Sequence, residues 1–161
     1  MSKKNAKADK AAGELLVCRN PKAERNFDVE ERLEAGLVLT GSEVKSLRKK
    51  HADLESAYAQ IENMQLYLMN MYIGPYKEAG HFGHEDKRRR KLLAHRHEIE
   101  RLHGRMAVRG YALVPVRVYF KHGRAKVELA LGKGRKVHDD RESIKRELDL
   151  KEARAAMTRK H

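Results

Sequence analysis

The sequence predicts one mainly β domain, a small antiparallel barrel with accessory helices, followed by a basic tail. Short segments rich in β-forming residues recur along the chain, and only one or two segments have helical spacing. Hydrophobic residues make up 40% of the 161 residues, which is enough for one compact core. We therefore expect a disordered basic N-terminus at 1–13, a folded domain at 14–132 and a basic C-terminal tail at 133–161.

The first half of the domain begins with a strand. The stretch "ELLVC" from Glu14 is rich in β-formers, and residues 27–39 alternate in part between polar and apolar side chains. The stretch "TGSEVKSLRKK" then indicates a short helix. Thr40 and Glu43 have the spacing of a capping box, which satisfies two free backbone N–H groups at a helix start.

The second half of the domain contains two predicted hairpins and a helix. Residues 56–76 alternate on both sides of Asn63, and the strands 111–120 and 124–132 flank a short Lys-His-Gly turn. Between these hairpins a helix is expected to start near His95, because apolar residues recur there at helical spacing: Ile99, Leu102 and Met106. Five or six strands with one or two helices favour a barrel of the OB type, and another α+β arrangement stays open.

The charge of the chain indicates a polyanionic partner. Lys and Arg number 36 against 23 Asp and Glu, for a formal net charge of +13. Residues 26–86 are acidic overall, whereas residues 87–109 hold 9 basic and 2 acidic side chains. Such segregation is typical of a nucleic-acid footprint, and an anionic membrane is the competing partner. No apolar run approaches the ~20 residues that span a bilayer. With no signal sequence and one cysteine, we expect a cytoplasmic protein without a membrane partner.

No residue pattern indicates catalysis. His81 and His84 have a spacing that could ligate a metal, but no third ligand lies nearby in the sequence. The "GKGRK" stretch at 132–136 lacks the spacing of a phosphate-binding loop, and Cys18 has no activating neighbour. Because no nucleophile and base occur at a recognisable spacing, we expect a protein that is not an enzyme and uses no cofactor or metal.

Four blocks in a fixed order carry a family resemblance. They are "EAGLVLTGSEVKSLR" at 34–48, "RRRKLLAHRHEI" at 88–99, "GYALVPVRVYF" at 110–120 and "LGKGRKVHDDRESIK" at 131–145. Together they resemble the signature blocks of the SsrA-binding protein family, also called small protein B, over about residues 20–154. The resemblance implies a six-stranded OB-type barrel with packed helices and a C-terminal tail that is disordered in solution.

The resemblance also implies a function. Members of the family bind tmRNA, bring it to stalled ribosomes and allow the nascent chain to be tagged for proteolysis, with tmRNA-bound elongation factor Tu as a further partner. In such a site Lys and Arg contact phosphates, whereas a carboxylate such as Glu34 accepts hydrogen bonds from base N–H groups or orients an arginine. The resemblance places RNA binding on Asn20, Arg25, Glu34, Lys45, Arg48, Lys91, Leu93 and His95, with Leu93 exposed and packed on an unstacked base.

The basic tail is expected to act on the ribosome. The resemblance implies that it enters the decoding centre and message channel of the small subunit, where rRNA contacts would order it. A helical tail would have a narrow apolar strip that includes Ile144 and Leu148. Asp140 and Leu148 depart from the family's usual Lys and aromatic residue. The expected ribosome-binding residues are Lys133, Arg135, Lys136, His138, Arg141 and Lys145.

Two other functions stay open from the residues alone. One is a generic OB-type RNA-binding or ribosome-associated protein that is not dedicated to tmRNA. The other is an enzyme of RNA metabolism, against which the missing catalytic pattern argues.

Overall fold

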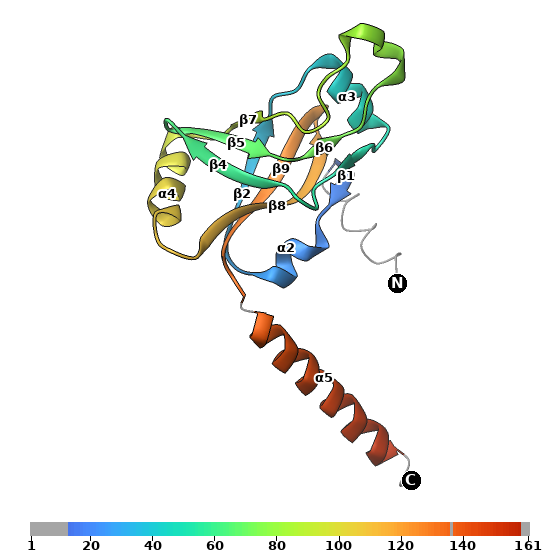
Figure 1. The fold of residues 1–161 in the computed structure, drawn as a ribbon, viewed down its shortest axis with the longest axis vertical. Coiled ribbons are helices and arrows are strands. Elements are labelled where there is room, and N and C mark those ends of the chain that lie inside the picture. The colour runs from blue at the N-terminus through green and yellow to red at the C-terminus, as the bar shows by residue number, and fades with distance from the viewer. Residues whose placement is uncertain (1–12, 136, 159–161) are drawn as a thin grey trace.

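Six antiparallel strands form a closed ring, with helices on its outside (Figure 1). The structure is a computed structural model that describes residues 13–135 and 137–158. Its elements are β1 (Glu14–Arg19), α2 (Pro21–Asn26), β2 (Phe27–Leu37), α3 (Gly41–Arg48), β3 (Ala52–Asp53), β4 (Tyr58–Glu62), β5 (Gln65–Met69), β6 (Tyr72–Ile73), the 3₁₀ helix η1 (Lys77–Phe82), β7 (Arg90–Leu93), α4 (Arg96–Met106), β8 (Tyr111–Lys121), β9 (Arg124–Gly134) and α5 (Val137–Thr158).

Strand β8 closes the ring because it pairs on both of its edges. The main sheet has the order β1-β8-β4-β5-β7-β2-β9, and β9 pairs again with β8. On its other edge β8 pairs with β4 through Ala59 and Leu113, and with β1 farther along. Two of the long strands contain a β-bulge. The bulge of β2 lies between Val29 and Glu31, and that of β8 lies between Pro115 and Arg117. Such bulges bend strands at the corners of a closed sheet. The predicted mainly β class with a six-stranded ring is confirmed.

The hydrophobic core fills the inside of the ring. Inward side chains of the strands meet there with Leu47 of α3 and Leu102 of α4, both fully buried. The alternation of side chains along each strand explains which residues are buried, because successive side chains point to opposite faces of a sheet. In β5, for example, Leu66 and Leu68 are fully buried while their neighbours are more exposed.

The predicted local elements are largely present. The helix after Thr40 is α3, and the Glu43 carboxylate accepts a hydrogen bond from the Thr40 N–H at 2.9 Å, as a capping box requires. The hairpin around Asn63 is β4–β5, and the second hairpin is β8–β9 with positive φ at His122 and Gly123. Two successive residues with positive φ angles form the backbone of a tight hairpin turn.

Five elements of the folded domain were not predicted, one of which is the 3₁₀ helix η1. Helix α2 begins with Pro21 after an Asn20 cap, and the two-residue strands β3 and β6 form a separate small sheet. Strand β7 lies in the basic run before α4, where no strand-like alternation of polar and apolar residues marks it. It is a strand because it completes the ring between β5 and β2.

The "GKG" of the C-terminal block belongs largely to the ring and not to the tail. Strand β9 continues to Gly134, two residues beyond the expected boundary at 132. Gly132 lies against the bulge of β2, where an added Cβ would overlap the Asp28 carbonyl and come within 3.2 Å of the Val29 Cα. Glycine is therefore needed at this position because two backbones approach closely.

The tail differs from the expected disordered segment. Residues Val137–Thr158 form α5, which projects away from the ring (Figure 1). Its pairs Glu142–Arg146 and Glu147–Lys151 have the i,i+4 order that supports a helix. Every α5 side chain whose exposure is described is exposed. The α5 side chains whose exposure is described therefore add nothing to the core, as expected, although the segment is helical. Residues 1–12 of the predicted disordered N-terminus lie outside the described residues. None of the described helices has the length and hydrophobicity to cross a membrane.

Candidate nucleic-acid interface

An exposed leucine marks the candidate site. In β7 the side chains of Arg90 and Leu92 point inward and are buried, whereas Lys91 and Leu93 point outward. Leu93 pairs with Gly36 of β2, and a Cβ on that glycine would lie 3.3 Å from the Leu93 Cβ. The Leu93 side chain therefore lies over a bare stretch of backbone and is 57% exposed.

Three shallow hollows meet at Leu93. One, of about 360 Å³, brings it together with Glu34, His95 and Lys126. A second, of about 420 Å³, includes Lys91, and a third, of about 330 Å³, includes Phe120 and Arg124. We call this region the Leu93 surface, which comprises Glu34, Lys91, Leu93, His95, Phe120, Arg124 and Lys126. It joins β2, β7, β8 and β9 with the start of α4, and some of these segments are far apart in the sequence.

The carboxylate of Glu34 is held in one orientation. The Tyr119 hydroxyl and the Lys121 ammonium both donate to its Oε2, the latter at 3.4 Å. The Tyr119 hydrogen bond lowers the pKa of Glu34, against the opposing effect of partial burial. Burial of the Tyr119 ring, together with this hydrogen bond, raises the pKa of Tyr119. In residues 13–135 and 137–158, Oε1 has no hydrogen-bond partner. Glu34 is therefore an ionised carboxylate, and its Oε1 can accept a hydrogen bond from a ligand.

His95 both caps α4 and borders the Leu93 surface. The Glu98 carboxylate accepts from the His95 backbone N–H at 2.9 Å, which satisfies a free donor at the helix start. The His95 ring is exposed and stacks on His97 with 5.5 Å between centroids and 15° between planes. The ring therefore remains available as a stacking or donating group next to Leu93.

Helix α3 presents its two cations to different regions. Its buried face holds Glu43, Ser46 and Leu47, so Lys45 and Arg48 lie on the outside. The Arg48 guanidinium lies 5.4 Å from the centroid of Phe120, which borders the Leu93 surface. Lys45 instead lies over the ring of Tyr76, at 5.4 Å. Arg48 thus joins the Leu93 surface, and Lys45 does not.

Besides Lys45, two more of the predicted RNA-binding residues lie away from the Leu93 surface. Asn20 is only 7% exposed, and its side chain is bonded internally: Nδ2 donates to the Leu54 carbonyl at 3.3 Å, and Oδ1 accepts from the Lys22 N–H at 3.2 Å. Its geometry is that of a helix cap that ties α2 to the chain before β4, and a buried amide bonded in this way has no free face. Arg25 is exposed on α2, at the opposite end of the ring from α3 (Figure 1).

All three arginines of the run Arg88-Arg89-Arg90 are held in ion pairs, although the sequence alone indicates a free basic patch. Arg88 and Arg90 both donate to the buried Glu43, from Nε at 2.7 Å and 2.8 Å respectively. Burial opposes ionisation of Glu43, but the hydrogen bonds from Arg88 and the Thr40 backbone, with the charge of Arg90, outweigh it and lower its pKa. Arg89 pairs with Glu62 at 2.5 Å. Lys91 is therefore the member of this block that faces outward without an ion-pair partner among the described residues.

The expected ribosome-binding residues divide between the ring and the tail. Lys133 is in β9, with its ammonium 5.0 Å from the Tyr111 ring centroid. Arg135 donates to Asp28 at 2.8 Å and fixes the exit of the chain from the ring. Lys145 is exposed on α5. Lys136 and the side chains of His138 and Arg141 lie outside the described residues.

Sequence reasoning missed part of the Leu93 surface. Phe120, Arg124 and Lys126 were not predicted, nor were the two donors to Glu34. A usable signal was present, because Arg124 and Lys126 alternate on a predicted strand and so project from one face. What the sequence did not show is that this face of β9 lies beside β2 and β7.

No metal centre is formed by the part of the chain that the structure describes. His84 is occupied by structural contacts, with Nδ1 2.9 Å from the Ser42 hydroxyl and Nε2 3.0 Å from the Ile73 carbonyl oxygen. Burial raises the pKa of the Cys18 thiol to about 12, so it stays protonated at neutral pH.

Comparisons with known proteins agree on one family. The family model described as SmpB protein matches residues 17–159. The SsrA-binding protein of Desulforudis audaxviator is 54% identical over 144 residues, which cover 89% of this chain and 94% of that protein. The SsrA-binding protein of Geobacter sulfurreducens is 47% identical over 148 residues, which cover 92% of this chain and 97% of that protein.

A solved structure shares the fold as well as the sequence. It is described as "tmRNA-SmpB: a journey to the center of the bacterial ribosome", and one of its chains superposes with a TM-score of 0.63 at 41% identity. The match covers 74% of this chain and 85% of the other. The family match over nearly the whole chain, the two relatives and the shared fold lead to one conclusion: the chain belongs to the SmpB family of SsrA-binding proteins.

Proposed function

We propose that this chain binds tmRNA through the Leu93 surface and, with tmRNA, rescues stalled ribosomes so that the nascent chain is tagged for degradation. The observation that carries the proposal is the composition of that surface. An exposed leucine lies between a pre-oriented carboxylate and several cations. Membership of the SsrA-binding protein family and the likeness to a chain described with tmRNA and the ribosome support the same function.

Each part of the Leu93 surface suits one feature of folded RNA. Leu93 offers an apolar platform to an unstacked base, and the His95 ring beside it can stack. Lys91, Arg124 and Lys126 supply the phosphate contacts that provide most of the affinity. The free Oε1 of Glu34 accepts from a base N–H or a ribose hydroxyl, which a cation cannot do.

The tail supplies a second, ribosomal contact in this proposal. Helix α5 is exposed along its described length and projects from the ring with basic side chains that include Lys145, Arg146 and Lys151. We propose that it lies in the decoding centre and message channel of the small subunit, where rRNA phosphates attract these cations. Elongation factor Tu on the tmRNA, in the cytoplasm, completes the assembly. The chain acts by binding in this proposal and carries out no catalysis.

The test compares two leucines of equal exposure. Leu93 is 57% exposed on the Leu93 surface, and Leu15 is 56% exposed on β1. Leu93→Ala is expected to weaken binding to the tRNA-like part of tmRNA roughly 5-fold or more, since burying a leucine side chain under a base contributes ~1 kcal/mol or above. Leu15→Ala is expected to bind as the parent does. Fluorescence anisotropy with labelled RNA measures both.

The outcomes separate tmRNA binding from general RNA binding. If both variants bind tmRNA equally well, the Leu93 surface is not the tmRNA site. If the parent binds an unrelated folded RNA of the same length as tightly as tmRNA, the chain is a generic RNA-binding protein.

A further inference from the structure

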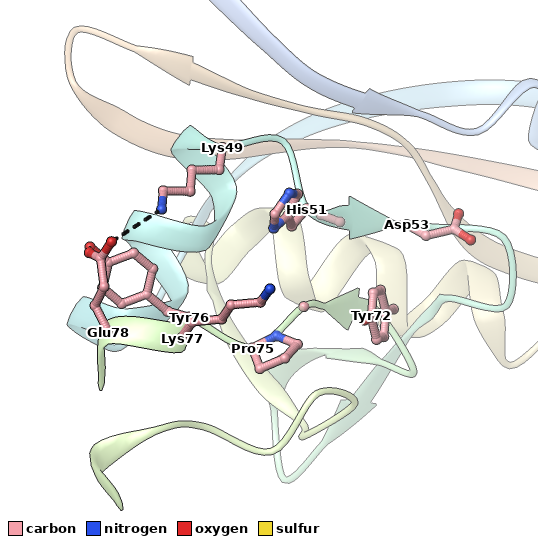
Figure 2. A pocket seen from close by; sticks show the side chains of 10 residues that line it. Lys49, His51, Asp53, Tyr72, Pro75, Tyr76, Lys77 and Glu78 are labelled. Carbon is pink, nitrogen blue, oxygen red and sulfur yellow. Dashed lines mark hydrogen bonds and ion pairs between the residues drawn. The ribbon is translucent and has the colours of Figure 1, made fainter. Parts of the chain in front are cut away.

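A hollow of about 620 Å³ lies apart from the Leu93 surface, between the end of α3, the small β3–β6 sheet and η1. It shares no residue with the three hollows around Leu93. Figure 2 shows its arrangement: Tyr76 stands beside the Lys49–Glu78 ion pair at one end, Tyr72 and Asp53 lie at the other, and His51 and Lys77 lie between them. The volume is in the range of sites that hold small molecules and nucleotides.

The floor of this hollow is a tightly bonded glycine. The Gly74 N–H donates to the His51 carbonyl at 2.8 Å, and the Ser46 hydroxyl donates to the Gly74 carbonyl at 2.6 Å. An added Cβ at Gly74 would lie 3.2 Å from the His51 Cβ and 3.4 Å from the Tyr72 hydroxyl. The absent side chain therefore keeps the space between the two rings open, and the two hydrogen bonds keep the floor in place.

One aromatic ring in the hollow is already covered and one is free. Lys45 and Lys49 lie 5.4 Å and 4.9 Å from the centroid of Tyr76, and the Tyr76 hydroxyl donates to Glu78. Tyr72 is 36% exposed. In the described ranges its ring has no aromatic or cationic partner and its hydroxyl no hydrogen-bond partner. Tyr72 thus offers an uncovered flat ring, with the exposed His51 ring nearby.

The charge around the hollow favours an anion. Three exposed lysines lie at the hollow, against the carboxylates of Asp53 and Glu78: Lys49 and Lys77 in its lining, and Lys45 over the Tyr76 ring. The Lys49–Glu78 pair is long, at 3.8 Å, and both side chains are more than half exposed, so it holds Lys49 only weakly. Lys77 forms no ion pair within the described part of the chain and reaches into the middle of the hollow (Figure 2).

We propose that this hollow binds one unpaired nucleotide of an RNA strand, as a contact separate from the Leu93 surface. The base stacks on Tyr72 beside His51, and its phosphate lies between Lys49 and Lys77. Asp53 lies opposite Tyr72 in the β3–β6 pair, and its Oδ1 accepts the Glu55 N–H at 2.9 Å. Its other oxygen is placed to accept from a base N–H. Stacking on an aromatic ring beside cations is the usual way to hold single-stranded RNA.

The composition of the hollow argues for RNA over a protein partner. Its lining holds two tyrosines, a histidine and two lysines, but no leucine, isoleucine, valine or methionine. Protein interfaces are depleted in Lys, Asp and Glu, whereas two lysines and two carboxylates line this hollow. Flat rings with lysines match a base and a phosphate.

The absence of tryptophan from the chain allows a specific test. Tyr72→Trp in the full chain creates one fluorophore at the site. Titration with a single-stranded RNA hexamer is expected to quench its emission saturably, because the base stacks on the indole, whereas inorganic polyphosphate leaves the emission unchanged. Val108→Trp places the control fluorophore at an exposed position after α4 and is expected to show no saturable quenching.

Affinity measurements complete the test. Tyr72→Ala is expected to weaken hexamer binding roughly 5- to 150-fold, while Tyr72→Phe retains it. Lys77→Gln is expected to lower the salt slope of binding by about 1. Thermal melts confirm that each variant is folded. Equal quenching by polyphosphate, or undiminished hexamer binding by Tyr72→Ala, overturns the proposal.

Two further probes identify the source of the strand. Quenching of Tyr72→Trp by the tRNA-like part of tmRNA assigns the nucleotide to tmRNA, and quenching by purified small ribosomal subunits assigns it to rRNA. If none of the RNA probes quenches, the hollow is not an RNA site. The result is independent of the proposed function, because Leu93→Ala tests the Leu93 surface and leaves Tyr72 unchanged.

Discussion

The Arg90 guanidinium donates from Nε to Oε1 of Glu43 at 2.8 Å, and both side chains are fully buried. Arg90 also donates to the backbone carbonyls of Met71 and Asp86, at 2.6 Å and 3.1 Å. One side chain therefore connects β7, α3 and the segments on both sides of η1. This pair fixes the position of α3, and with it Arg48 at the Leu93 surface.

Glu43→Gln is expected to destabilise the protein strongly. The substitution leaves the buried Arg90 without its counter-charge, and breaking a buried pair in this way costs about 3–5 kcal/mol. Urea unfolding followed by circular dichroism measures the change. Glu62→Gln is the matched control, because Glu62 pairs with Arg89 on the surface and such a pair contributes about 0–1 kcal/mol. Equal losses in the two variants would show that burial of the Glu43 pair is unimportant.

Stability is expected to fall on acidification below about pH 4.5, the ordinary pKa of glutamate. The pKa of Glu43 is lowered in the folded protein, so its carboxylate contributes stability above the unfolded pKa. That contribution is lost as the pH falls through the lower folded pKa. Urea midpoints measured from pH 6 downward should therefore decline more steeply in the parent than in Glu43→Gln. Parallel curves for the two proteins would contradict this assignment.

Glu34→Gln is expected to weaken tmRNA binding with little change in stability. The carboxylate is more than one-third exposed, and its Oε1 is the acceptor proposed to meet the RNA. In the variant the amide oxygen is expected to face the Tyr119 and Lys121 donors, which leaves an N–H donor in place of that acceptor. Loss of a negative charge alone would strengthen binding to a polyanion, so the sign of the effect is informative. Anisotropy titration compares it with Glu55→Gln, which removes an exposed acid paired with Lys22. Tighter binding by Glu34→Gln would show that Glu34 does not contact the RNA and serves only as the acceptor for Tyr119.

Affinity for tmRNA is expected to fall steeply with salt. About six phosphate contacts give a slope of log affinity against log salt of roughly −4 to −5. The double variant Arg124→Gln, Lys126→Gln removes two of these contacts and should lower the magnitude of the slope by about 1 to 2. Lys22→Gln with Lys87→Gln, two exposed cations outside the Leu93 surface, serves as the control. An unchanged slope in the first double variant would exclude this strand face from the footprint.

A chain that ends at Arg135 is expected to fold normally and bind tmRNA, but to fail in peptide tagging. It retains β9 and the Asp28–Arg135 contact, whereas none of the α5 side chains whose exposure is described is buried. The melting temperature should therefore stay nearly constant, since exposed segments rarely change stability by more than a few tenths of a kcal/mol. Tagging by purified stalled ribosomes measures the loss. Lys145→Gln with Arg146→Gln in the full chain should reproduce it in part, and normal tagging by the shortened chain would rule out the proposed role of α5.

Local sequence was sufficient to predict the elements that depend on interactions between residues close together in the chain. The capping box of Thr40 and Glu43, the hairpin turn at Asn63 and the helix after His95 depend on contacts between near neighbours, so each could be predicted. The outward position of Leu93 came from the family resemblance. Two of the differences have local causes in the sequence: the Asn20 cap before Pro21 favours α2, and the i,i+4 pairs of the tail favour a helix.

Tertiary structure alone decided which charges face solvent. Arg88 and Arg90 are indistinguishable from Lys91 in a basic run, yet the first two turn to Glu43, 45 and 47 residues away. Likewise Arg124 and Lys126 reach Leu93 only because closure of the ring places β9 beside β2 and β2 beside β7. Net charge and strand alternation depend on composition and local geometry, which the sequence contains. The partner of a given charge depends on which strands pair, and the free energy of burying the core as a whole determines that pairing.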